Sequence, residues 1–321
     1  MTWRPTASLE QLQQRSELLR RTRQFFYSRG FCEVQTPVLG RDTVVDRHLD
    51  PIEVAAQSIG LKTGSPKYFL QTSPEFSMKR LVAAGAKAIF EIGPAFRAGE
   101  SGKLHNPEFT MLEWYRVGHR FEDGVLFLKE LACDLLDAVD CDVLTYADAM
   151  QEHAGIDIFT LGTQELARLA SQRFDVDADW SDDRDDWFDL FFSELVQPKL
   201  GESCPAILTH YPASQSALAK LSAEDPRTAE RYELFYQGVE LANGYHELQD
   251  AGELHGRNER VNRQRISDGK PPLPVDSEML HAMRAGLPAC CGCALGFDRL
   301  QMVTTAAQNI SEVLCFPIDN C

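Results

Sequence analysis

The run from His105 to Tyr115, HNPEFTMLEWY, constrains the fold most, because its side chains alternate in character with a period of two. Side chains two apart on a β-strand share one face of the sheet. One face of the predicted strand is typical of a packed core: Thr110, Leu112 and Trp114. The other face carries Phe109, Met111, Glu113 and Tyr115. A ring, a carboxylate and a phenol on one face indicate a binding site rather than core packing.

Helices and strands are expected on both sides of this run. A capping box at Ser8 and Gln11 predicts a helix to about Ser28, with Gly30 as its stop. The other predicted helices cover residues 73–84, 121–139, 163–173, 184–195, 225–235 and 298–307. The predicted strands cover residues 31–34, 68–71, 89–92, 107–115, 240–248 and 289–295. Strands interrupted by a helical insert, roughly residues 145–199, predict an α+β fold rather than alternating βαβ units.

The charge balance argues against a nucleic-acid partner. The net charge is -16, and no run of Lys and Arg stands out, whereas proteins gain much of their affinity for nucleic acids by neutralising phosphates. No apolar run is long enough to span a membrane, and the first residues do not begin a signal peptide. The nine cysteines form no paired CxxC modules, which favours reduced thiols. The expected compartment is the cytoplasm, with no membrane partner.

A stretch between Gly252 and Pro274 carries four arginines: Arg257, Arg260, Arg263 and Arg265. As a loop, it could contact an acidic partner. The alternative is a solvated helix face, which is the more common origin of such a run.

Four segments place polar groups among apolar residues: 72–75, 96–100 with the opening run, Glu233 with 240–248, and 294–299. Each segment taken alone has an ordinary explanation. A single arginine between loops is usually a surface ion pair, and a Gly-x-Asp-Arg sequence can simply begin a helix. The order of the four segments along the chain carries more information than any one of them.

Together these segments resemble the catalytic core of class II aminoacyl-tRNA synthetases, specifically the lysyl branch. Gly30–Pro37 (GFCEVQTP) is similar to the first motif of that family, Phe96–Glu113 to the second, and Gly296–Arg299 (GFDR) to the third. The resemblance covers nearly the whole chain. It implies one catalytic domain over residues 1–321, an antiparallel sheet flanked by helices, a homodimer, and ATP bound in a bent conformation.

The resemblance also implies a site for ATP and Mg²⁺. It assigns catalytic roles to Arg97, at the α-phosphate, and to Arg299, near the adenine and the γ-phosphate. Arginine suits both positions because a guanidinium holds phosphate bidentately and stacks on rings. Phe109 would stack on the adenine, and Glu233 and Glu240 would hold the magnesium. The remaining implied nucleotide contacts are Ala98, Gly99, Glu100, His105, Asn106, Leu241 and Gly296. Many relatives have a glutamate at the position of Gly99, so either Glu100 replaces it or that contact is lost.

A cationic amino acid is the second substrate that the resemblance implies. A buried ammonium must be paired and hydrogen-bonded. The residues that match the lysyl family's contacts are Ser73, Pro74, Glu75, Glu113, Tyr115, Asn243 and Glu247. The alternative is that Glu113 and Glu247 are ordinary carboxylates at a sheet edge.

Three departures separate this chain from a lysyl-tRNA synthetase. First, the core begins near residue 1, which leaves no room for a preceding anticodon-binding domain. Second, the net negative charge opposes tRNA docking. Third, Ala294 stands where those enzymes usually carry glycine. These features resemble the elongation factor P–lysine ligase family, whose members attach β-lysine to a lysine side chain of that factor. The resemblance implies activation of (R)-β-lysine, or lysine, as an adenylate. Our hypothesis is that Ala294 reshapes the pocket so that an amino group on Cβ, rather than Cα, is accepted.

Two alternatives stay open. One is a truncated lysyl-tRNA synthetase or tRNA acylase, which a basic acceptor-stem surface would support. The other is a non-catalytic regulatory paralogue, which would be expected to lose Arg97, Arg299 or the metal carboxylates, all of which are present.

Overall fold

The computed structural model describes residues 3–62 and 66–321. It divides into two compact units, which are described separately: unit 1 is Met1–Arg120 with Glu247–Cys321, and unit 2 is Phe121–His246. Across these described ranges, no helix combines the length and the apolar character that a membrane span requires.

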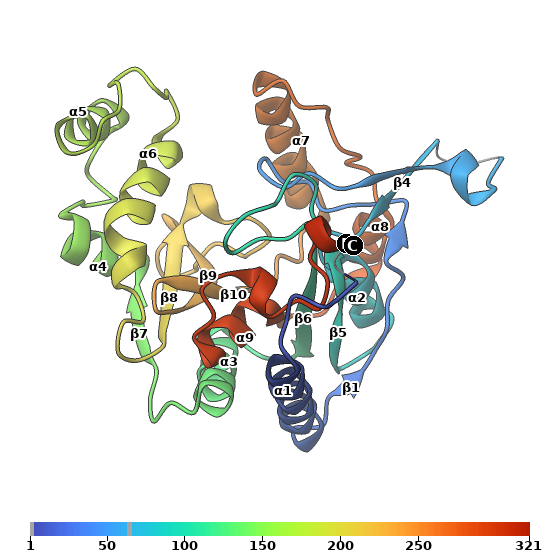
Figure 1. Cartoon of the computed structure of the whole chain (residues 1–321). Coiled ribbons are helices and arrows are strands. Elements are labelled where there is room, and N and C mark those ends of the chain that lie inside the picture. Colours follow the sequence, from blue (N-terminus) through green and yellow to red (C-terminus); the bar gives the residue numbers. More distant parts are fainter. Residues whose placement is uncertain (1–2, 63–65) are drawn as a thin grey trace. The chain divides into compact units, whose positions relative to one another are not determined.

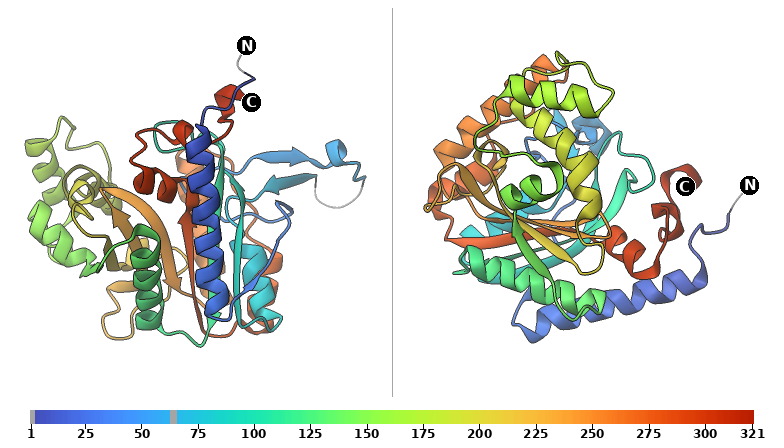
Figure 2. Two further views of the ribbon diagram at one scale, coloured as in Figure 1. Left: turned by 60° about the horizontal axis from the view of Figure 1, so that its bottom comes forward. Right: turned by 90° about the vertical axis from the view of Figure 1, so that its left-hand side faces the viewer.

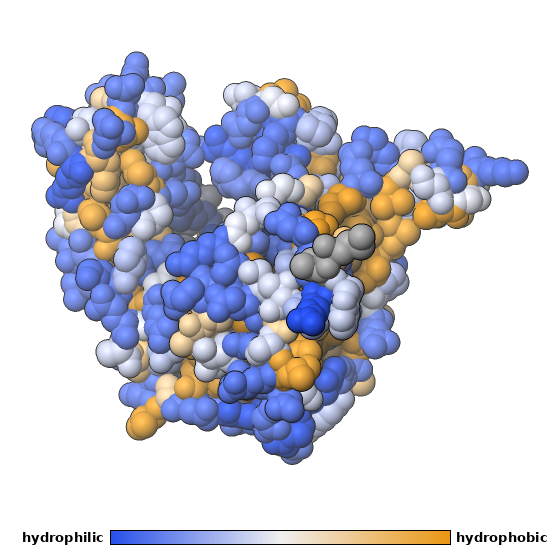
Figure 3. All heavy atoms as spheres, in the orientation of Figure 1, coloured by the Kyte–Doolittle hydropathy of each residue, from blue (hydrophilic) through white to orange (hydrophobic). Residues whose placement is uncertain are grey.

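Unit 1 is built on four strands in the order β1-β5-β6-β11 (Figure 1). They are β1 (Cys32–Glu33), β5 (Ala88–Phe96), β6 (Glu108–Val117) and β11 (Cys290–Gly296). β6 pairs antiparallel with both β5 and β11, while β1 and β5 run parallel. A separate three-stranded sheet consists of β2 (Leu39–Gly40), β4 (Lys67–Leu70) and β3 (Glu53–Ala55). Figure 3 shows a largely hydrophilic surface on the visible face, with apolar side chains gathered along this small sheet.

Helix α1 (Leu9–Ser28) packs against the β1-β5-β6-β11 strands, as the views in Figure 2 show. Ser8 caps it by accepting a hydrogen bond from the Gln11 amide, and Gly30 follows in a left-handed conformation. Phe26 is fully buried, and its ring stacks on Phe90 with centroids 4.6 Å apart. The predicted first helix and its cap are therefore confirmed.

The other helices of unit 1 position the candidate site. They are α2 (Glu75–Ala83), α7 (Ala251–Ser267), α8 (Glu278–Gly286) and α9 (Phe297–Thr305). The loop predicted at 252–274 is wrong over most of its length, because α7 covers it. Arg265 is 1% exposed and pairs with Asp50, and Arg257 is buried beside Glu253. Two of the four arginines thus stabilise the fold, while Arg260 and Arg263 are exposed.

Unit 2 contains strands in the order β10-β9-β8-β7: β10 (Val239–His246), β9 (Thr228–Tyr236), β8 (Ala206–Pro212) and β7 (Asp142–Thr145). Helix α3 (Phe121–Leu136) packs against β9 and β10. Helical elements fill the segment between β7 and β8, including α4 (Tyr146–Ala149), α5 (Thr163–Arg173) and α6 (Arg184–Phe191). They bury an apolar cluster that includes Trp187, Phe188 and Phe235.

The helix predicted for residues 225–235 is wrong, because these residues form most of strand β9. Hydrogen bonds to β8 on one side and β10 on the other extend this segment. Pairing on both edges outweighs the local spacing of apolar residues that suggested a helix. The α+β class is confirmed: the sheet strands pair mostly antiparallel, with helices packed against them.

Candidate active site

The predicted carboxylates of unit 1 lie together in its interior. Glu75 begins α2, Glu113 lies in the middle of β6, and Glu247 directly follows β10. Their exposed fractions are 8%, 1% and 0%. The Tyr115 hydroxyl donates to Glu113 Oε1 over 2.6 Å, so this predicted phenol joins the same cluster. Three carboxylates removed from water in one place require cations to compensate them.

One of those cations is Lys79, a residue that sequence reasoning missed. It lies one turn after Glu75 on α2, with 1% exposure. Its ammonium donates to Glu75 Oε1 and lies 2.6 Å from Glu247 Oε2. The signal in the sequence was the four-residue spacing, which places Glu75 and Lys79 on one helix face.

Three oxygens of the cluster lack a hydrogen-bond partner among the described residues: Glu113 Oε2, Glu247 Oε1 and Glu247 Oε2. The last of these lies 2.6 Å from the Lys79 ammonium, as an ion pair. Burial raises the pKa of Glu113 well above its usual range, and the nearby Glu75 carboxylate raises it further. Burial also raises the pKa of Glu247 to about 7, against the opposing effect of the Lys79 ammonium. For Lys79, the two carboxylates outweigh burial and raise its pKa. The unpartnered oxygens of this acidic cluster, which consists of Glu75, Glu113, Glu247 and Tyr115, can therefore accept further cationic groups.

Strand β11 leaves room for the side chains of the acidic cluster. Gly292 lies opposite Tyr115, and Ala294 lies opposite Glu113. A β carbon on Gly292 would lie 2.2 Å from the Tyr115 ring and 2.5 Å from Glu247 Oε1. Only a glycine therefore lets both side chains approach the strand this closely. Sequence reasoning missed Gly292 and identified Ala294.

The Thr72–Glu75 junction supports the start of α2. The Glu75 amide donates to Ser73 Oγ over 3.3 Å, and Pro74 is the residue before the helix. Proline is tolerated there because the first amides of a helix have no intrahelical acceptor. Glu75 is therefore the first residue of α2, and its side chain is buried in the interior of unit 1.

The predicted nucleotide residues of unit 1 flank the loop between β5 and β6. The Arg97 guanidinium lies 5.0 Å from the centre of the Phe109 ring. The Glu100 carboxylate lies 3.8 Å from Arg97, close enough for a loose ion pair. Ala98 anchors the loop by donating from its amide to Asp50, and Gly99 adopts a φ of 77° that favours glycine. The loop thus presents a cation beside an aromatic face.

At the end of this loop, His105 Nε2 lies 2.6 Å from an Arg299 nitrogen. Partial burial and the Arg299 guanidinium lower the pKa of His105, so its neutral ring can accept this hydrogen bond. The Asn106 side chain donates to Glu108 and accepts from the Ile318 amide, so it secures the loop to the C-terminal segment. The structure thus brings Arg299 and His105 together, while the Asn106 amide already has partners within the fold.

Gly296 ends β11 and precedes α9, which carries Arg299 on its first turn. Asp298, 1% exposed, accepts hydrogen bonds from Arg15 over 2.7 Å and from the Thr110 amide over 2.6 Å. This contact ties α9 to α1 and to β6. Sequence reasoning treated Asp298 only as part of a motif and missed Arg15, whose partners lie far away in the sequence.

The remaining predicted site residues lie in unit 2. Glu233 on β9 pairs across the strands with Asn243 on β10, and Leu241 is buried. Glu233 accepts hydrogen bonds from Arg231 and Tyr211. An irregularity in the strand pairing occurs between Glu240 and Ala242.

These residues fit a hard cation such as Mg²⁺, which prefers oxygen ligands and binds through one or two carboxylates. The Asn243 side-chain oxygen is buried and has no hydrogen-bond partner among the described residues. An ionised carboxylate such as that of Glu233 has further lone pairs beyond the two contacts it already makes. Within the described ranges, no group of three or more His, Cys, Asp or Glu side chains gathers at a metal-binding spacing.

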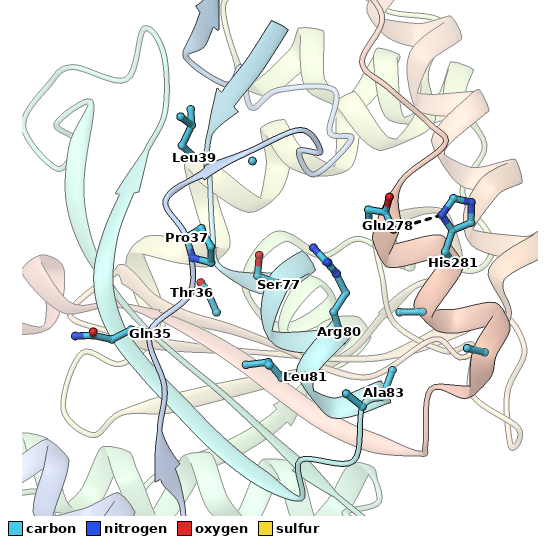
Figure 4. Close-up of a pocket in the computed structure, with 14 residues that line it drawn as sticks. Gln35, Thr36, Pro37, Leu39, Ser77, Arg80, Leu81, Ala83, Glu278 and His281 are labelled. Carbon is cyan, nitrogen blue, oxygen red and sulfur yellow. Dashed lines mark ion pairs between the residues drawn. The ribbon is translucent and has the colours of Figure 1, made fainter. Parts of the chain in front are cut away.

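A groove of about 700 Å³ lies between α2 and α8 (Figure 4), and neither Glu75 nor Lys79 lines it. It is lined by the segment Gln35–Gly40, by α2 residues such as Arg80 and Leu81, and by Glu278 and His281 of α8. None of the predicted substrate or nucleotide residues lines it. The groove is therefore separate from the acidic cluster.

Comparisons with known proteins agree with this geometry. The family described as tRNA synthetases class II (D, K and N) matches residues 1–320. A protein of Salmonella arizonae named Elongation factor P--(R)-beta-lysine ligase is 42% identical over 320 residues, which cover 99% of this chain and 98% of that protein. Proteins with the same name from Salmonella paratyphi B and Salmonella schwarzengrund match at the same identity and coverage.

Proposed function

The chain belongs to the class II tRNA synthetase family of the D, K and N group, and on that basis we propose that it is an elongation factor P–(R)-β-lysine ligase. The observation that carries the proposal is the cluster of buried carboxylates at Glu75, Glu113 and Glu247. Such a pocket favours an acyl donor with two ammonium groups. Both lysine and β-lysine have this character.

The reaction has two steps. The donor carboxylate attacks the α-phosphorus of ATP in line, which forms the aminoacyl-adenylate and releases pyrophosphate. The ε-amine of a lysine on elongation factor P then attacks the acyl carbon; an amide forms, AMP leaves, and the amine loses a proton. No side-chain nucleophile is needed, because positioning and charge neutralisation lower the barrier.

Each substrate has its own set of residues in this proposal. Arg97 neutralises the α-phosphate as negative charge develops there, and Arg299 binds the adenine and γ-phosphate region. Phe109 supports the adenine. The other proposed nucleotide contacts are Ala98, Gly99, Glu100, His105, Asn106, Glu240, Leu241 and Gly296. The donor contacts are Ser73, Pro74, Glu75, Glu113, Tyr115, Asn243, Glu247 and Ala294.

Mg²⁺ accompanies the ATP in this proposal, and Glu233 and Glu240 hold it. When bound, it neutralises charge on the phosphates. The contact of Glu233 with Arg231 and Tyr211 orients that carboxylate from the protein side.

We also propose that the protein acts in the cytoplasm as a homodimer. The groove beside α2 supports the dimer, because it is lined by residues of the segment Gly30–Pro37, which resembles the family's dimer-interface motif. Light scattering coupled to gel filtration tests this proposal: a dimer mass is expected, and a monomer at micromolar concentration would contradict it.

ATP–pyrophosphate exchange tests the activation step. We expect exchange with (R)-β-lysine, with weaker or no exchange with lysine, and no acylation of tRNA in the presence of either. Acylation of tRNA in place of elongation factor P would support the tRNA acylase alternative. A complete lack of exchange with both donors would support a non-catalytic regulator.

A further inference from the structure

Lys79 is a buried cation inside the proposed donor pocket. Its ammonium contacts the Glu75 carboxylate and lies 2.6 Å from Glu247 Oε2, and it lies 5.8 Å from the centre of the Tyr115 ring. With 1% exposure, it has no access to solvent that would compensate its charge. Its position is therefore fixed by the carboxylates around it.

The charges of the pocket can be counted from these residues. When Glu75, Glu113 and Glu247 are all ionised, the single ammonium of Lys79 leaves two negative charges uncompensated. The carboxylate oxygens Glu113 Oε2, Glu247 Oε1 and Glu247 Oε2 also lack a hydrogen-bond partner among the described residues, although Glu247 Oε2 lies 2.6 Å from the Lys79 ammonium. The residual charge and the residual acceptors both match a ligand with two ammonium groups.

We propose that Lys79 is a specificity-determining residue. Its ammonium holds Glu75 and Glu247 together and leaves two negative charges when the three carboxylates are ionised, so that the site selects a donor with two ammonium groups. This inference rests on the proposed function. In this arrangement Lys79 acts through the two carboxylates and does not take part in the chemistry.

Under this proposal, donor binding depends on pH through Glu247 and the groups that face it. They are Lys79 and Glu75 from α2 and, through the same cluster, Glu113 and Tyr115 from β6. The pKa of Glu247 is about 7 even with Lys79 beside it, since burial outweighs the ammonium. Removal of the ammonium would raise that pKa further. Donor binding requires ionised carboxylates, so its pH midpoint would then move upward.

The experiment compares Lys79→Met with the double variant Lys79→Met/Glu75→Gln in ATP–pyrophosphate exchange. The double variant removes the ammonium and one carboxylate, and so restores two negative charges. For Lys79→Met we expect KM for (R)-β-lysine to rise at least about tenfold with KM for ATP nearly unchanged, and the pH midpoint of donor binding to rise. For the double variant we expect KM for the donor to be lower than in Lys79→Met, although still above the wild-type value.

A purely structural role of Lys79 would give a different result. KM for the donor would rise by the same factor at every pH, and the double variant would bind the donor no more tightly than the single variant. Either outcome would overturn the proposal. If the wild-type protein activates neither lysine nor β-lysine, the proposed function itself fails, and this is distinct from failure of the Lys79 proposal. An unchanged KM for ATP shows that the variants are folded.

Should Lys79→Met not fold, calorimetry of the wild-type protein tests the charge count. Binding of (R)-β-lysine is compared with binding of its analogue in which a hydroxyl replaces the terminal amine, in buffers of different ionisation enthalpy near pH 6.5. The dication should release about one proton more than the monocation. Equal proton release for both donors would overturn the proposal.

Discussion

Ala294 on β11 lies directly opposite Glu113 on β6 in an antiparallel pair. Residues that face each other across such a pair project from the same side of the sheet. The Ala294 methyl group therefore lies on the side of the buried carboxylate. This relationship supports our proposal that Ala294 influences the choice between an amino group on Cα and one on Cβ of the donor.

The first prediction follows from that methyl group. Ala294→Gly should shift the preference in adenylation away from (R)-β-lysine and toward lysine, because it enlarges the pocket beside Glu113. One methyl group is worth about 1–3 kcal/mol in such discrimination. Steady-state exchange with both donors measures the effect, and an unchanged preference would show that Ala294 does not control it.

Gly292→Ala should disrupt donor binding, because the new methyl group would lie 2.2 Å from the Tyr115 ring. Tyr115 and Glu247 must both move away, at a cost of about 1–3 kcal/mol for overpacking. We expect a raised KM for the donor and a smaller change in KM for ATP. Gly162→Ala is the matched control, since a β carbon added there would meet open space among the described residues. Equal kinetics for the two variants would contradict this account of the pocket.

Arg97→Lys should lower kcat for pyrophosphate exchange by about 10²–10³-fold, since an ammonium cannot reproduce the bidentate contact that we propose between Arg97 and the α-phosphate. The packing of the guanidinium against Phe109 is lost as well. Arg260→Lys, on the exposed side of α7, is the control and should retain full activity. A similar kcat for Arg97→Lys and the wild-type protein would rule out the proposed role.

The pKa values of the pocket predict how stability changes with pH. Burial raises the pKa of Glu247 to about 7 and that of Glu113 well above its usual range. Because the folded state binds these protons more tightly than the unfolded state, their contribution to stability is present at low pH and is lost as pH rises toward and past 7. The Tm of the free protein should therefore fall from about pH 5 to pH 8.

A donor that neutralises the same carboxylates should offset that loss. The increase in Tm on addition of (R)-β-lysine should thus be larger at pH 8 than at pH 6, and scanning calorimetry at both values measures it. A Glu113→Gln/Glu247→Gln variant provides the control and should lose this pH dependence. A donor effect that is larger at the lower pH would contradict the pKa assignment.

Several parts of the fold and site could be predicted from local sequence. The Ser8 cap defines α1, and the alternation along 105–115 places Glu113 and Tyr115 together, because both depend on neighbours in the chain. Strand β9 was predicted as a helix, because its conformation depends on hydrogen bonds to β8 and β10 that local spacing does not reveal.

Residues fixed by distant contacts were also missed. In the sequence, Lys79 has the appearance of a surface lysine in an amphipathic helix. Its burial is explained by its ion pair with Glu247, a residue much later in the chain. Gly292 is restricted by the Tyr115 ring across the strand pair. In both cases the information lies in tertiary packing rather than in residue type.

The central claim is that the acidic cluster binds a dicationic acyl donor, which reacts with ATP and is then transferred to a protein lysine. The most direct measurement is the intact mass of elongation factor P after incubation with this protein, ATP and (R)-β-lysine. The account predicts a gain of one lysyl group on one lysine side chain, dependent on ATP and abolished in Glu75→Gln/Glu247→Gln. An unchanged mass of elongation factor P, with (R)-β-lysine recovered on tRNA, would contradict it.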